Sequence, residues 1–119
     1  MTTKLLLCGI KQGQKKDGCQ FGPDNLLHKL NANNFFSIVK ISDFNKNPYQ
    51  LIYNETVNYN NKMLVLGGDH SIGISTVFGS LYKFKQNLKV IWVDAHADIN
   101  TEESSLSKTC LSLLNEYLR

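Results

Sequence analysis

The 119-residue sequence predicts an α/β fold in three layers (α/β/α), with helices on both faces of an open, mostly parallel sheet. Short apolar segments typical of strands alternate along the chain with longer segments whose apolar residues recur at helical spacing. Parallel strands are covered on both faces, which accounts for the nearly continuous apolar runs. Hydrophobic residues make up 42% of the sequence, which is enough for the core of one domain of this length.

The expected strands are short runs rich in Leu, Ile and Val that are bounded by polar residues or glycine. They cover residues 4–9, 37–41, 62–66 and 89–93. The expected helices have apolar residues three and four positions apart, as in an amphipathic helix. They cover residues 24–30, about 48–59, 71–85 and 107–118.

The most informative motif is Asp94-Ala95-His96-Ala97-Asp98, which directly follows the apolar run at 89–93. In an extended segment, alternate side chains point to the same face, so the three polar residues would project together. Two carboxylates beside an imidazole concentrate negative charge that a divalent cation offsets. Oxygen ligands with an imidazole suit manganese, magnesium, zinc or iron. On these residues alone, a solvated turn explains the motif equally well.

A second motif, Gly67-Gly68-Asp69-His70-Ser71, follows the expected strand at 62–66. Paired glycines allow close backbone approaches that a Cβ would prevent. Ser71 is predicted to cap the next helix, and a histidine such as His70 is more often a loop residue than a ligand. Ligands of open α/β sheets collect at the carboxyl ends of strands, however, and both motifs lie there. Together they predict a metal site.

The two motifs, followed by Ile99-Asn100-Thr101, resemble the arginases within the ureohydrolase group. The resemblance covers roughly residues 4–105 and includes the loop at 9–14 and the later Gly18, Gly22-Pro23 and Leu26. It implies a two-manganese centre that hydrolyses L-arginine to L-ornithine and urea. Agmatinases share the Asp-Ala-His-x-Asp motif, so an agmatinase-like amidinohydrolase is a weaker alternative. Asn100-Thr101 favours an arginase.

The resemblance also assigns roles to individual residues. By motif match, His70, Asp94 and Asp98 hold one manganese, while Asp94 and His96 help to hold the other, so that Asp94 bridges the two. Asp98 is the candidate catalytic proton shuttle. Asn100 is expected to bind the α-carboxylate of L-arginine.

The sequence departs from the arginase pattern after Ser105, which with Ser107 lies near the expected contact to the substrate carboxylate. The family continues there with Ser-Gly-Asn-x-His-Gly, whose histidine is catalytic, and later with an Asp-x-Asp cluster of further metal ligands. Neither is present. We therefore expect residues 1–119 to form the N-terminal portion of an arginase-like domain with a divergent helical tail at 106–119.

Because the catalytic histidine and the Asp-x-Asp ligands are missing, we expect this chain alone to bind one manganese weakly and to show weak or no turnover. The alternative is a non-catalytic arginase-like protein that binds metal partially or pairs with another chain. Such pairing is expected because the strand at 89–93 would leave an unpaired apolar sheet edge. A homo-oligomer is one form that this pairing could take.

The composition argues against several other classes of protein: nucleic-acid-binding, disulfide-rich, secreted and membrane-spanning proteins. The net charge of +3 is small, and the basic residues Lys11, Lys15 and Lys16 are more typical of a solvated loop than of a nucleic-acid or phosphate site. The three cysteines, an odd number, do not indicate a disulfide framework. The apolar run at 5–8 is too short for a signal peptide, and no run is long enough to span a membrane. We expect a cytoplasmic protein that binds a small molecule.

Overall fold

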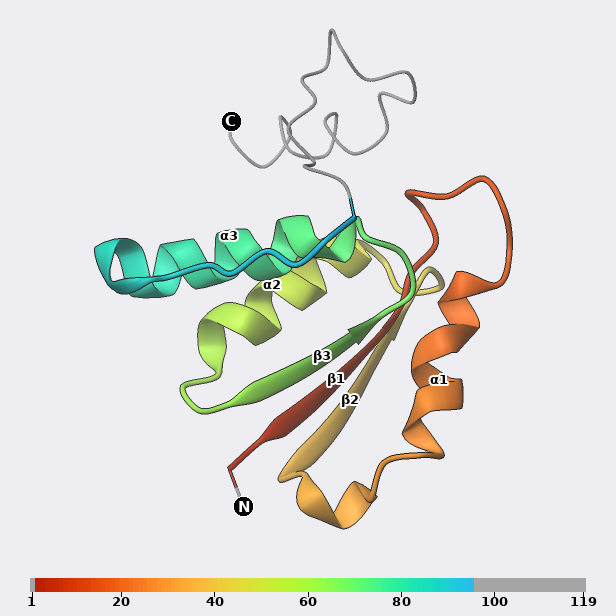
Figure 1. Ribbon diagram of the computed structural model, residues 1–119, viewed down its shortest axis with the longest axis horizontal. Helices are drawn as coiled ribbons and strands as arrows, with labels where there is room; N and C mark the ends of the chain where they lie inside the picture. The colour runs from red at the N-terminus through yellow and green to blue at the C-terminus, as the bar shows by residue number, and fades with distance from the viewer. Residues whose placement is uncertain (1, 96–119) are drawn as a thin grey trace, which may run out of the picture.

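The computed structural model describes residues 2–95, which form a small parallel sheet with helices on both of its faces (Figure 1). The three strands are β1 (Lys4–Gly9), β2 (Ser37–Ser42) and β3 (Met63–Gly67). Their order in the sheet is β2-β1-β3, and both pairings of β1 are parallel. These are the first three strands that the sequence predicts, each within one residue at its ends.

The helices of the described chain alternate with the strands, as the sequence predicts. They are α1 (Gly22–Leu27), α2 (Pro48–Asn58) and α3 (Ile72–Phe84). Helices α2 and α3 lie together on one face of the sheet, and α1 lies on the opposite face (Figure 1). The structure therefore has the three layers of an α/β/α fold. The expected helix at 107–118 lies outside the described residues.

The centre of the core is β1, whose residues 5–8 are almost completely buried. Alternation along this strand divides its side chains between the two faces of the sheet. Leu6 and Cys8 belong to the cluster that also contains Ile10, Ile41, Tyr49 and Ile52, so this cluster lies under α2. Cys8 is completely buried and is therefore a core residue, and burial raises the pKa of its thiol to about 12.

Helices α2 and α3 pack closely because α3 carries a glycine at their contact. A Cβ on Gly79 would lie 2.8 Å from Cβ of Thr56 and 3.3 Å from the carbonyl oxygen of Tyr53. The missing side chain thus lets the backbones of the two helices approach one another.

The prediction of a fourth strand at 89–93 is wrong, because residues 88–94 have no strand conformation in the structure. This segment instead runs back along α3, where Gly73 contacts the ring of Trp92 (Figure 1). A strand that is apolar on both sides needs cover on both faces of the sheet. In the described chain Leu64 of β3 is already 38% exposed, so the outer position beside β3 lacks that cover. Ile91 and Val93 are 88% and 93% exposed in the conformation that forms.

Candidate functional site

The β3–α3 loop (residues 67–71) lies against the loop that follows β1, and the glycines of this loop make that approach possible. A Cβ on Gly68 would lie only 2.3 Å from the carbonyl oxygen of Ile10. The backbone N–H of Gly68 donates to the carbonyl of Cys8 at 2.9 Å, and that of Asp69 donates to Ile10 at 2.9 Å. The pairing of β1 with β3 thus continues past the ends of the strands, and it sets the backbone position of His70.

Asp69 is the residue that holds this loop in place, and it is 93% buried. Its Oδ2 accepts a hydrogen bond from the backbone N–H of Gly13 at 2.7 Å. Its Oδ1 accepts one from the backbone N–H of Ser71 at 2.7 Å and another from the Ser71 hydroxyl. No role is predicted for Asp69 from the sequence. The signal was the Asp-x-Ser spacing, which allows an aspartate to accept from the backbone two residues later.

Ser71 occupies the N-cap position of α3, but the prediction that its side chain caps the helix is wrong. Its hydroxyl donates to Asp69 instead, and it also forms a hydrogen bond with the hydroxyl of Tyr49 at 2.5 Å. A serine hydroxyl has one proton, so the proton given to the carboxylate is not available to the helix.

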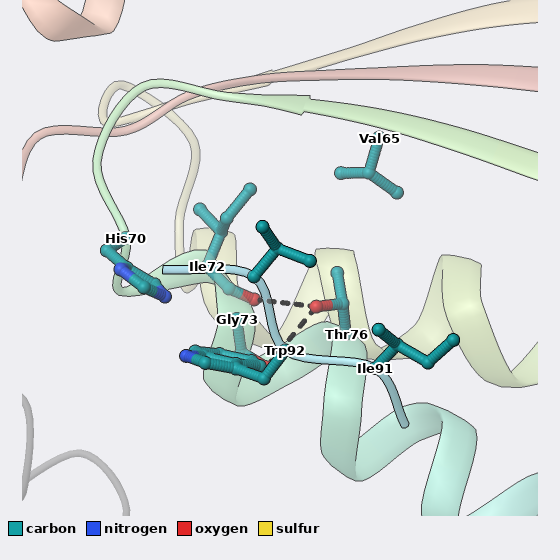
Figure 2. Close-up of a pocket in the computed structure, with 8 residues that line it drawn as sticks. Val65, His70, Ile72, Gly73, Thr76, Ile91 and Trp92 are labelled. Carbon is teal, nitrogen blue, oxygen red and sulfur yellow. Dashed lines mark hydrogen bonds between the residues drawn. The ribbon is translucent and has the colours of Figure 1, made fainter. Parts of the chain in front are cut away.

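The structure brings His70 and Asp94 together, as the metal-site prediction requires. Nδ1 of His70 lies 3.1 Å from Oδ2 of Asp94, and the two side chains are 48% and 18% exposed. The imidazole also stacks on the ring of Trp92, with centroids 4.9 Å apart and an interplanar angle of 22° (Figure 2). The two candidate ligands come from different segments, the β3–α3 loop and the stretch that runs along α3.

A groove of about 480 Å³ lies beside this pair (Figure 2). Its lining is mostly apolar, with His70 and Thr76 as the polar side chains, and consists of Val65, His70, Ile72, Gly73, Thr76, Ile91, Trp92 and Val93. The hydroxyl of Thr76 donates to the carbonyls of Ile72 and Gly73, at 3.3 and 3.2 Å, and is therefore directed toward its own helix. An imidazole is the main polar group that this groove offers to a ligand.

The basic loop after β1 is held by carboxylates. The Lys11 side chain pairs with Asp17, and its backbone N–H donates to Oδ2 of Asp43 at 3.0 Å. The hydrogen bond and charge of Asp17 raise the pKa of Lys11, and Lys11 in turn lowers the pKa of Asp17. Because the Lys11 charge is compensated within the chain, this loop is a weak candidate for a phosphate site.

The other predicted site residues, His96, Asp98, Asn100, Ser105 and Ser107, lie outside the described residues. Within residues 2–95, no group of three or more His, Cys, Asp or Glu side chains is arranged to hold a metal ion. The described chain thus provides His70 and Asp94 of the predicted ligand set. No helix of the same residues has the length and apolar character needed to cross a membrane.

The fold and the site together define a class of protein: an α/β protein with an imidazole and a carboxylate at the carboxyl end of a parallel sheet. The model of the Arginase family matches residues 4–112, and the chain belongs to this family. Its resemblance to the arginases is thereby confirmed.

Curated relatives agree with this assignment. The chain is 43% identical over 74 residues to the arginase of Plasmodium falciparum, a match that covers 62% of this chain and 18% of that protein. It is 36% identical over 125 residues to the arginase of Entamoeba histolytica, covering 82% of this chain and 42% of that protein. It is 60% identical over 47 residues to the arginase of Neurospora crassa, a match that covers 36% of this chain and 13% of that protein. The chain thus spans less than half of each relative. No solved structure matches it.

Proposed function

We propose that this chain provides part of an arginase-type manganese site, in which His70, Asp94, His96 and Asp98 bind metal for hydrolysis of L-arginine to L-ornithine and urea. The observation that carries the proposal is the pairing of His70 with Asp94 at 3.1 Å. Membership of the Arginase family and curated arginases among the relatives support it.

The donor set of this pair fits a divalent metal. Two ligand atoms held about 2.1 Å from one ion, at right angles to each other, lie about 3.0 Å apart. The separation of 3.1 Å between Nδ1 of His70 and Oδ2 of Asp94 agrees with this value. One nitrogen and one carboxylate oxygen also match the ligand preferences of manganese. When bound, manganese supplies an activated water for attack on the guanidinium carbon.

The protein groups then orient the ligands and the substrate. His70 would bind the metal through a ring nitrogen that carries no proton. The stacked ring of Trp92 restricts the rotation of the His70 imidazole. Asp98 is proposed to move a proton toward the leaving amine, and Asn100, Ser105 and Ser107 to bind the α-carboxylate of L-arginine.

A manganese titration followed by electron paramagnetic resonance tests the metal site. We expect one weak site in the whole chain, with affinity at least tenfold lower in His70→Asn and in Asp94→Asn. Asp17→Asn is the matched control, because it removes an exposed carboxylate that pairs with Lys11 away from the site. Equal affinity in all four proteins would refute the assignment of His70 and Asp94 as ligands.

Urea release from L-arginine tests the reaction itself. We expect little or no turnover from residues 1–119 alone, because these residues do not include the family's catalytic histidine loop and second ligand cluster. Turnover that His96→Asn abolishes would show that this chain is an active enzyme on its own. If turnover occurs, a comparison of L-arginine with agmatine distinguishes the arginase from the agmatinase alternative, since Asn100 predicts dependence on the α-carboxylate.

A second candidate function, non-catalytic pairing with another chain, is favoured by one observation. The apolar side chains of Ile91 and Val93 are 88% and 93% exposed, beside the half-exposed ring of Trp92. A contiguous exposed apolar surface is typical of a protein–protein contact. Light scattering across a range of concentrations tests this: we expect a homodimer that Ile91→Asp with Val93→Asp dissociates, and a wild-type monomer throughout would exclude it.

A further inference from the structure

Four segments of the protein meet at one buried hydrogen-bond network beside His70, which consists of Gly13, Asp69, Ser71 and Tyr49. Asp69 is 7% exposed, Ser71 1% and Tyr49 4%. Tyr49 lies at the start of α2, and Gly13 belongs to the loop after β1. The hydrogen-bond network therefore joins that loop, α2, the β3–α3 loop and the beginning of α3.

The direction of each hydrogen bond follows from the proton count. The carboxylate of Asp69, when ionised, only accepts, so the Ser71 hydroxyl must donate its single proton to it. The hydrogen bond of 2.5 Å between Tyr49 and Ser71 is then donated by the Tyr49 hydroxyl. The backbone N–H groups of Gly13 and Ser71 add two further donors to the carboxylate. Three donated hydrogen bonds thus compensate for the burial of the carboxylate.

The residues that this network fixes are the two neighbours of His70. Both Asp69 and Ser71 are held through side chain and backbone, and the carbonyl of His70 itself accepts from the N–H of Gly73 at 3.0 Å. The imidazole of His70 meets Asp94 and Trp92. Asp69 and Ser71 flank His70 in the sequence, so the hydrogen bonds that hold these two residues also restrain the backbone of His70.

We propose that Asp69, Ser71 and Tyr49 are positioning residues that hold His70 in the orientation needed to bind a divalent metal together with Asp94. The proposal rests on the proposed function for its metal, but the positioning itself is a property of the metal-free chain. Residues that fix a ligand typically change metal affinity by about 10–100-fold when replaced.

Three substitutions test the individual hydrogen bonds of this network separately. Asp69→Asn keeps the shape of the side chain but places an amide NH₂ against either the N–H of Gly13 or the donors of Ser71. Ser71→Ala removes the central hydroxyl, which Tyr49 and Asp69 share. Tyr49→Phe removes the outer donor alone and leaves the contact between Ser71 and Asp69. We expect the effect to decrease in this order.

The first measurement uses the whole metal-free chain. The ring protons of His70 should show a ring-current shift in the NMR spectrum, because the imidazole stacks on Trp92 at 4.9 Å. We expect that shift to be largely lost in Asp69→Asn and Ser71→Ala, and reduced in Tyr49→Phe. The second measurement is manganese affinity by electron paramagnetic resonance, with about a tenfold loss expected for the first two variants.

Thr56→Val is the matched control for a general loss of stability. It removes a part-buried hydrogen bond of 2.9 Å from the Thr56 hydroxyl to Ile52, within α2 and away from the loop. We expect it to leave both the His70 shift and the manganese affinity unchanged. If Asp69→Asn does not fold, Tyr49→Phe still tests the proposal, since it conserves volume and removes a single hydroxyl.

The outcomes distinguish this proposal from the proposed function. An unchanged His70 shift in folded Ser71→Ala and Tyr49→Phe, or an equal change in Thr56→Val, overturns the positioning role. If the shift responds as expected but His70→Asn binds manganese as tightly as wild type, positioning is supported and the metal assignment of His70 fails.

Discussion

Replacing Gly68 by alanine tests whether the contact between the two loops at the end of β1 and β3 stabilises the fold. The added Cβ would lie 2.3 Å from the carbonyl oxygen of Ile10, 3.1 Å from the carbonyl oxygen of Cys19 and 3.1 Å from Cα of Gln20. All three are backbone atoms, so no flexible side chain can move aside. The loops must separate.

The cost follows from what that separation breaks. The hydrogen bonds from Gly68 to Cys8 and from Asp69 to Ile10, both 2.9 Å, would be lost or lengthened. Each contributes about 0.5–1.5 kcal/mol net, and overpacking adds about 1–3 kcal/mol. We therefore expect Gly68→Ala to lower the free energy of unfolding by about 3 kcal/mol. This is a large share of the roughly 5–15 kcal/mol that a domain of this kind has.

Urea unfolding followed by fluorescence measures this change, since Trp92 is the single tryptophan of the chain. With an m-value of about 2 kcal/mol/M, the midpoint should fall by about 1.5 M. Gly22→Ala is the matched control, because nothing lies within 4 Å of its added Cβ and its φ of −54° is helical. It should leave the midpoint unchanged or slightly higher. Equal midpoints for the two variants would refute the close-approach argument.

Two further predictions concern the core. Gly79→Ala should destabilise the chain by about 1 kcal/mol, because its Cβ would meet Thr56 at 2.8 Å, and the double variant with Thr56→Ala should recover most of that loss in the same unfolding assay. The raised pKa of Cys8, about 12 against 9.0, means that above pH 9 the unfolded chain loses this proton while the folded chain keeps it. Its contribution to stability is thus complete below pH 9 and should fall by up to about 1.4 kcal/mol per pH unit between pH 9 and 12. A stability–pH curve compared with that of Cys8→Ala checks this, and a Cys8-independent slope would contradict it.

Local patterns were sufficient to predict most of the fold. The runs at 4–9, 37–41 and 62–66 are short, apolar and bounded by polar residues or glycine, and each forms a strand of the parallel sheet. The run at 89–93 has the same local pattern but does not form one. Whether this run forms a strand depends on whether other elements cover both faces of the sheet beside β3. The five residues themselves do not indicate whether such elements are present.

The candidate site was predictable for a similar reason and to a similar extent. His70 follows β3 as predicted and lies 3.1 Å from Asp94, but Asp94 does not follow a strand, so the premise that both motifs lie at carboxyl ends of strands holds for His70 alone. The contact of Asp69 with Ser71 has a local signal in the Asp-x-Ser spacing, but its contact with Gly13 could not be predicted, because Gly13 lies 56 residues away. The role of Asp69 depends on a tertiary contact, whereas the metal motifs are local.

The two described ligands of the proposed site are held by different means, and this difference determines how tightly the chain can bind metal. His70 lies between two residues that buried hydrogen bonds fix. Asp94 belongs to a segment outside the sheet, whose neighbour Val93 is 93% exposed. An ion bound by both must therefore restrict the segment at 88–94, and the lost conformational entropy opposes binding. From this asymmetry we expect weak binding of one manganese, even where the ligand atoms are correctly spaced. A strand at 89–93, covered on both faces, would remove that entropic cost and increase the affinity.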